Sequence, residues 1–167
     1  REESQRIATE FLDWRQHYLI GREFWRGEQA TASGWPNFFL AKTDATTTIG
    51  EGLTPCGGLA LLETAAAGNA MADDENVCGG YQAIIHASPA LVTAWTRDFT
   101  VTRVGDANRG QFSITDQGTI VITGPGYDGT GPGDTEPTEQ TNGETWAYLT
   151  GFLQVRLGPT ELFSRTS

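Results

Sequence analysis

Basic residues are scarce in this chain of 167 residues, which carries 11 lysine and arginine side chains against 21 aspartates and glutamates. Lys42 is the only lysine, and the formal net charge is −10. Binding to nucleic acid or to an anionic membrane surface relies on clustered basic side chains, which replace the counterions of the phosphates. The charge balance therefore argues against nucleic acid and against a membrane as partners.

Long apolar runs and cysteines are also scarce. No apolar run approaches the roughly 20 residues that a helix needs to cross a bilayer. The two cysteines, Cys56 and Cys78, are better interpreted as two reduced thiols than as one disulfide. Glycine, by contrast, is abundant at 21 residues, about twice its average usage. The length fits one domain with a hydrophobic core, or one domain with an extended arm.

Residues 2–30 predict a long helix. Gly21 and Gly27 are expected to weaken its last third, so a break is expected there. The stripe on this helix is strongly aromatic and suits either a core contact or a seam between subunits, of which the core is the simpler interpretation. Its members recur at spacings of three and four, at Ile7, Phe11, Trp14, Tyr18, Gly21 and Trp25.

Beyond residue 56 the pattern changes to short helices and strands. Ser88 and Pro89 suit the N-cap and the first turn of a helix that runs to about Arg97. Residues 124–143 hold so much glycine, proline and acid that they predict a long loop. This order of elements is typical of the α+β class with a mostly antiparallel sheet. The other predicted elements are a helix at 59–67 ended by Gly68, and strands at 83–87, 99–104, 111–114, 119–123 and 144–157.

No pattern of catalytic or metal-binding residues reaches a specific signature. Residues 124–129 read Gly-Pro-Gly-Tyr-Asp-Gly, but the glycines and proline that follow cannot open the helix that a dinucleotide site requires. The acids of 73–75 and 124–143 fit solvated loops better than a calcium site. Cys78 and His86 are a candidate thiol–imidazole pair, for which structural roles are the simpler explanation. The residues therefore predict no catalysis, no cofactor and no metal.

Five stretches between Gly21 and Pro159 carry a resemblance to one known family. In content and order they resemble the major capsid proteins of tailed bacteriophages, particularly those of actinobacterial hosts, which have the Hong Kong 97-type coat fold. The resemblance implies a structural subunit of an icosahedral capsid, which self-assembles into a shell enclosing double-stranded DNA. The five stretches read GREFWRGEQATASGWPNFFLA, GLALLETAAAG, GGYQAIIHASPALVTAW, TIVITGPGYDGTGP and WAYLTGFLQVRLGP.

The same resemblance implies a domain organisation, a set of partners and a location. Residues 1–56 would hold the spine helix and an irregular segment of a peripheral domain. Residues 57–167 would form an axial domain of helix and sheet, with 144–167 returning to the peripheral domain. The partners would be copies of the chain and other virion proteins, around DNA that is enclosed and not specifically bound. The location would be the virion, after assembly in the cytoplasm of the bacterial host. The expected interface residues, mostly aromatic anchors, are Phe24, Trp25, Trp35, Phe38, Phe39, Tyr127 and Asp128.

Two other functions remain open from the sequence. One is a carbohydrate- or protein-binding module on a virion or cell surface, with Trp35, Tyr127 and Trp146 as stacking surfaces. The other is a small hydrolase that uses Cys78 and His86.

Overall fold

Helices precede and flank a small sheet. The computed structural model describes residues 2–34, 39–42, 48–71, 83–98, 100–104, 112–133 and 144–151. Along the chain its elements are α1 (Glu2–Arg26), α2 (Glu28–Ala32), α3 (Pro55–Met71), β1 (Ile84–Ala87), α4 (Pro89–Arg97), β2 (Val101–Val104), β3 (Phe112–Thr115), β4 (Ile120–Ile122) and β5 (Ala147–Thr150).

The described strands form one sheet in the order β2-β3-β4-β1-β5. Neighbouring strands run antiparallel except β1 and β4, which pair in parallel with Ile85 opposite Val121. The predicted hairpin between β3 and β4 is present, and Gly118 supplies the positive φ of 90° in its turn. Strand β1 lies between β4 and β5 and is buried along its whole length. The predicted α+β class with a mostly antiparallel sheet is therefore confirmed.

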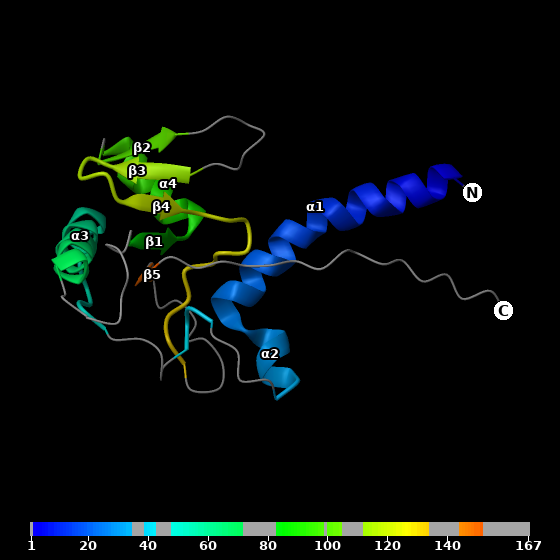
Figure 1. Cartoon of the computed structure of the whole chain (residues 1–167), viewed down its shortest axis with the longest axis horizontal. Helices are drawn as coiled ribbons and strands as arrows, with labels where there is room; N and C mark the ends of the chain where they lie inside the picture. Colours follow the sequence, from blue (N-terminus) through cyan, green and yellow to red (C-terminus); the bar gives the residue numbers. More distant parts are fainter. Residues whose placement is uncertain are drawn as a thin grey trace.

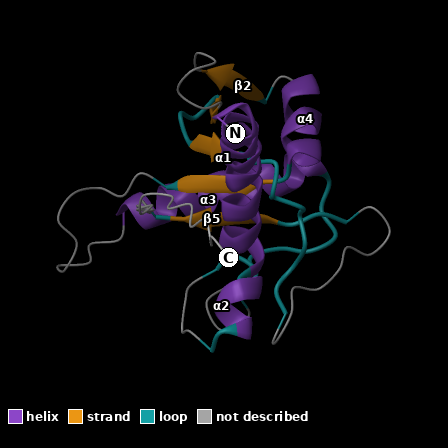
Figure 2. Cartoon of the chain, turned by 90° about the vertical axis from the view of Figure 1, so that its right-hand side faces the viewer, coloured by secondary structure: helices purple, strands orange, loops and turns teal. Residues whose placement is uncertain are grey.

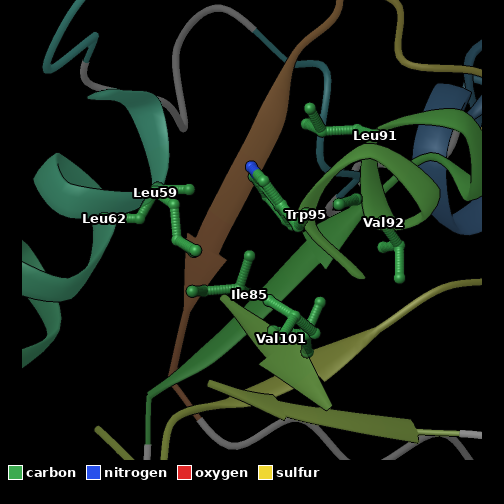
Figure 3. Packing of buried hydrophobic residues seen from close by; sticks show 9 residues of the cluster. Leu59, Leu62, Ile85, Leu91, Val92, Trp95 and Val101 are labelled. Carbon is green, nitrogen blue, oxygen red and sulfur yellow. The ribbon is translucent and has the colours of Figure 1, made fainter. Parts of the chain in front are cut away.

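One face of the sheet is covered by α3 and α4, whose apolar side chains form the larger core cluster. Figure 3 shows Leu59 and Leu62 of α3 beside strand β5, with Trp95 of α4 and Ile85 of β1 close by. Ile85 and Trp95 are almost completely buried. Burying a leucine or isoleucine side chain away from water contributes about 1.5–3 kcal/mol to the stability of the fold. This cluster therefore fixes both helices to the sheet.

The start of α4 agrees with the prediction from sequence, whereas the end of α3 does not. Helix α4 starts as expected, because the Ser88 hydroxyl accepts a hydrogen bond from the Leu91 backbone N–H at 3.4 Å and Pro89 occupies the first turn. Helix α3 is longer than the predicted 59–67, and the expectation that Gly68 ends it is wrong. A glycine inside a helix costs about 1 kcal/mol relative to alanine. The buried leucines of α3 outweigh that cost.

The predicted helix of residues 2–30 is confirmed as α1 and α2, with a break at Gly27, whereas α1 continues through Gly21 without a break. Gly27 has a φ of 61°, and a Cβ atom there would overlap the Phe39 ring, so the position favours glycine twice over. In Figure 1, α3 lies at one side of the sheet and α1 extends away from the other. Figure 2 looks along α1 from its N-terminal end, with the strands behind it.

Two predicted elements lie partly outside the described residues. Of the strand predicted at 144–157, β5 covers Ala147–Thr150, and residues 152–157 lie outside the described part. Of the loop predicted at 124–143, residues 124–133 are described and contain no helix or named strand, whereas 134–143 lie outside. The division into units at 1–56 and 57–167 stays a prediction.

Candidate functional site

Helix α1 meets the second face of the sheet through a buried aromatic cluster. Trp25 is 0% exposed, and its ring centroid lies 4.9 Å from that of Tyr127 and 5.0 Å from that of Tyr148. The indole Nε1 of Trp25 donates to the Thr130 hydroxyl at 3.1 Å, and the Tyr148 hydroxyl donates to the Thr130 carbonyl at 2.9 Å. Every polar atom of these three rings is thus hydrogen-bonded, as burial requires, once the Tyr127 hydroxyl's contact with His86 is counted.

The glycine-rich stretch 124–129 packs directly on α1. Gly126 lies so close to the helix backbone at Arg22 that the position has no room for a side chain. Gly129 has a φ of 79°, which also favours glycine. These glycines therefore serve helix packing, which explains their spacing without a nucleotide.

His86 of β1 lies at the edge of the aromatic cluster, on the face of the sheet that α1 contacts. Its Nε2 lies 2.9 Å from the Thr150 hydroxyl, its Nδ1 lies 3.3 Å from the Tyr127 hydroxyl, and its ring packs on Phe24 of α1. Burial lowers the pKa of His86 to about 4, because the charged imidazolium loses its hydration. Burial likewise raises the pKa of Tyr127 to about 12 and raises that of Tyr148. His86 is thus a neutral packing residue near pH 7.

Ion pairs surround the C-terminal end of α1. Arg26 lies 2.8 Å from Asp128 and 3.0 Å from Glu28, which also pairs with Arg22 at 2.8 Å. The hydrogen bond from Arg22 lowers the pKa of Glu28, and the same hydrogen bond raises the pKa of Arg22. Asp128 accepts two hydrogen bonds from Thr130, through its backbone N–H and its hydroxyl. These contacts orient the end of α1 on the loop that carries Tyr127.

The structure corrects part of the expected interface. Trp25, Phe39 and Tyr127 are buried in the chain's own core, so they are not exposed anchors for another subunit. Phe24 is half-buried against the same cluster, and Asp128 is exposed but engaged with Arg26. The expectation failed because aromatic content marks a contact without saying whether the partner is the same chain. Trp35 and Phe38 lie outside the described residues.

Among the residues of the α1 stripe whose burial the structure describes, only Trp25 at the C-terminal end is buried. The interpretation of the whole stripe as core is wrong, since its members Ile7, Phe11 and Tyr18 are 55%, 53% and 37% exposed. Leu12 and Leu19 lie outside the predicted stripe and are exposed as well, so the exposed apolar surface of the helix is wider than that stripe. Sequence reasoning missed Leu12 and Leu19 because they fall outside the spacing of three and four, although both are apolar positions on a predicted helix. We call these five residues the apolar arm.

A groove of about 940 Å³ runs beside strand β5, between the strand and α3. One wall consists of residues 48–55 and the α3 positions Gly58, Leu61, Leu62 and Ala65. The other wall consists of residues 144–150. Leu91 and Trp95 of α4 reach the groove between these walls. No sequence signal pointed to this groove, because it arises from the spacing of elements far apart in the chain.

The residues of the two alternative functions do not form a site in the described part. Tyr127 is buried and Trp146 half-buried, while Trp35 lies outside, so no exposed stacking surface joins them. Cys78 also lies outside the described residues, and His86 is enclosed by Phe24, Tyr127 and Thr150. Among the described side chains, no group of three or more His, Cys, Asp or Glu is placed to hold a metal ion.

Comparison with known proteins supplies no relative. No protein family, curated protein or solved structure that was compared with the chain matches it. Within the described residues, no helix combines the length and the apolar character that a membrane crossing needs.

Proposed function

We propose that the chain is a structural subunit of a phage-like icosahedral capsid with the Hong Kong 97-type coat fold. In this proposal its partners are copies of itself and other virion proteins. The shell encloses double-stranded DNA without binding it specifically, and the subunit carries out no catalysis. The resemblance of five sequence stretches to capsid proteins motivates the proposal, and the apolar arm of α1 is the structural observation that carries it.

The apolar arm has no covering partner among the residues that the structure describes. Helix α1 has 25 residues, a length of about 37 Å, and only its last turns reach the aromatic cluster. By helix geometry Ile7, Phe11 and Tyr18 fall on one stripe of α1, and Leu12 and Leu19 fall beside it. Exposed apolar side chains gathered on one element are typical of a protein interaction site. A shell subunit makes such a contact with each neighbour, because assembly repeats the same interface.

The charges of α1 favour a second copy as that partner. The first half of the helix, residues 2–13, has four acidic side chains and one basic one, whereas the second half, residues 14–26, has three basic side chains and one acidic one. Two copies of the helix in antiparallel contact would therefore place opposite charges beside each other. Such complementarity steers association and fixes its register.

The attachment of α1 to the rest of the chain suits an arm that is held rigidly at one end. Trp25 is hydrogen-bonded and fully buried, and Gly126 brings a loop into direct contact with the helix backbone. A helix fixed at one end in this way presents its exposed stripe in a defined direction. Defined geometry is what repeated assembly requires, because small errors in angle prevent a shell from closing.

Sedimentation velocity of the complete chain tests this proposal. We expect concentration-dependent association of the wild-type chain, and loss of that association in the double variant Ile7→Asp, Phe11→Asp. His17→Asp is the matched control, because His17 is exposed on α1 outside the apolar arm. A wild-type chain that stays monomeric at every concentration, or a double variant that associates like His17→Asp, contradicts the proposal.

A further inference from the structure

The groove beside β5 follows the unpaired edge of the sheet. Strand β5 is the last strand in the order and, among the described strands, pairs only with β1. All seven consecutive residues 144–150 line the groove. Successive side chains of a strand point to opposite faces, so a groove that touches every residue must run along the strand's edge. At such an edge the backbone N–H and C=O groups of β5 that do not face β1 point outward, whereas the N–H of Trp146, just before the strand, already donates to the Gly129 carbonyl.

The wall facing β5 carries exposed apolar side chains among polar ones. Ile49 and Leu53 are 49% and 48% exposed, and Leu61 of α3 lies exposed beside them. Gly58 also lines the groove, and a Cβ atom there would meet nothing within 4 Å. An extended segment in this groove would thus find backbone partners on one side and apolar side-chain contacts on the other, which is the arrangement used in strand addition.

The charge of the groove selects among extended segments. Glu51 and Glu144 are the charged residues among those that line it, and both are exposed. An acidic segment would be repelled there, whereas a segment with an arginine or lysine would be attracted. The groove thus fits a strand that alternates aliphatic residues with polar ones and carries a positive charge.

We propose that this groove binds residues 152–157 of a second copy of the chain, added as a strand to the edge of β5. That segment reads Phe-Leu-Gln-Val-Arg-Leu, in which Leu153, Val155 and Leu157 alternate with Gln154 and Arg156. The other undescribed segments of ten or more residues, 72–82 and 134–143, are acidic. The inference rests on the proposed function, since it names a second contact between subunits of the same assembly.

A second copy can offer all of residues 152–157 to the groove. Gly151 directly follows β5, so a chain would reach its own groove only through a tight turn, which would use Gly151 and Phe152 and remove Phe152 from the pairing segment. A neighbouring copy has no such constraint. Exchange of a strand between copies also joins subunits through backbone hydrogen bonds, which do not depend on the identity of each side chain.

A charge exchange between two variants tests the inference by sedimentation velocity. The first variant carries Glu51→Lys and Glu144→Lys, and the second carries Arg156→Glu. Each alone places like charges together at the groove, and we expect its association constant to fall about tenfold. In an equimolar mixture each groove meets a segment of opposite charge, and we expect association to return to within about threefold of wild type. Asp116→Lys, a charge reversal in the exposed turn between β3 and β4, is the matched control and should associate like wild type.

The possible results separate this inference from the proposed function. Rescue by mixing supports the exchange between copies. Two weakened variants that fail to rescue each other, with rescue only when all three substitutions stand in one chain, overturn it, because the segment then binds its own groove. Variants that associate like wild type, while Ile7→Asp, Phe11→Asp does not, overturn the inference and leave the proposed function standing.

Discussion

The backbone of Gly126 lies directly against the backbone of α1 at Arg22. A Cβ atom on residue 126 would overlap the Arg22 nitrogen and the Tyr18 carbonyl oxygen, neither of which can move without disturbing the helix. This contact fixes the loop of residues 124–130 to the helix, and with it Tyr127 and Thr130, the partners of Trp25. The attachment of the arm therefore depends on the absence of one side chain.

Gly126→Ala should separate α1 from the loop of residues 124–130. Because the new methyl group meets backbone rather than a flexible side chain, we expect the free energy of unfolding to fall by about 3 kcal/mol. Gly124→Ala is the control, since a Cβ there would lie 3.5 Å from the Tyr127 ring, an ordinary contact. Urea unfolding followed by circular dichroism measures both. Equal stability of the two variants would mean that the loop does not pack on the helix.

Trp25→Ala should lower the free energy of unfolding by about 3–5 kcal/mol, because it empties a fully buried site and leaves Thr130 without its indole donor. Phe11→Ala, on the exposed part of the same helix, should change it by less than about 0.5 kcal/mol in the monomer. Chemical denaturation at a concentration below that of association compares the two. A mild effect of Trp25→Ala would place its ring in solvent.

Acid should lower the free energy of unfolding of the chain through protonation of His86. Its pKa is about 4 in the folded chain against an ordinary 6.5, so the unfolded chain takes up the proton first. The stability that neutral His86 contributes is complete above about pH 6.5 and is lost as the pH falls toward 4, a total of about 3 kcal/mol. We expect His86→Gln to show a smaller loss of stability over this interval than wild type.

Measurements of unfolding free energy at pH 7, 6, 5 and 4 test the role of His86, and the difference between wild type and variant removes the contribution of the carboxylates. His17→Gln, at an exposed position on α1, serves as control. Identical pH profiles for wild type and His86→Gln would show that His86 does not titrate with folding.

Gly68→Ala should stabilise the chain by about 1 kcal/mol. Residue 68 lies inside α3, and a Cβ there would meet nothing within 4 Å, so alanine gains helix propensity at no steric cost. Thermal unfolding should show a higher midpoint for the variant. A lower midpoint would indicate that the helix ends at Gly68, as predicted from the sequence, with a backbone conformation there that favours glycine.

Local signals predicted much of the fold. The Ser88-Pro89 start of α4, the hairpin turn at Gly118 and the break at Gly27 each depend on a few neighbouring residues, and each is present. The end of α3 was missed because a glycine lowers helix propensity by only about 1 kcal/mol, which by itself does not end a helix.

The candidate site was less predictable than the fold. Trp25 and Phe11 belong to one stripe by sequence, yet one is buried and the other exposed, because only the end of α1 reaches the sheet. The groove beside β5 was invisible for a similar reason, since its walls come from residues 48–65 and 144–150. Periodicity reports which face of an element is apolar, and only the arrangement of elements decides what covers that face.

Electron microscopy of the complete chain under associating conditions tests the central claim most directly. The account predicts closed particles of uniform diameter with icosahedral symmetry from the wild-type chain, and no particles from Ile7→Asp, Phe11→Asp. Wild-type material that yields only separate monomers, or the same particles from the double variant, would contradict it.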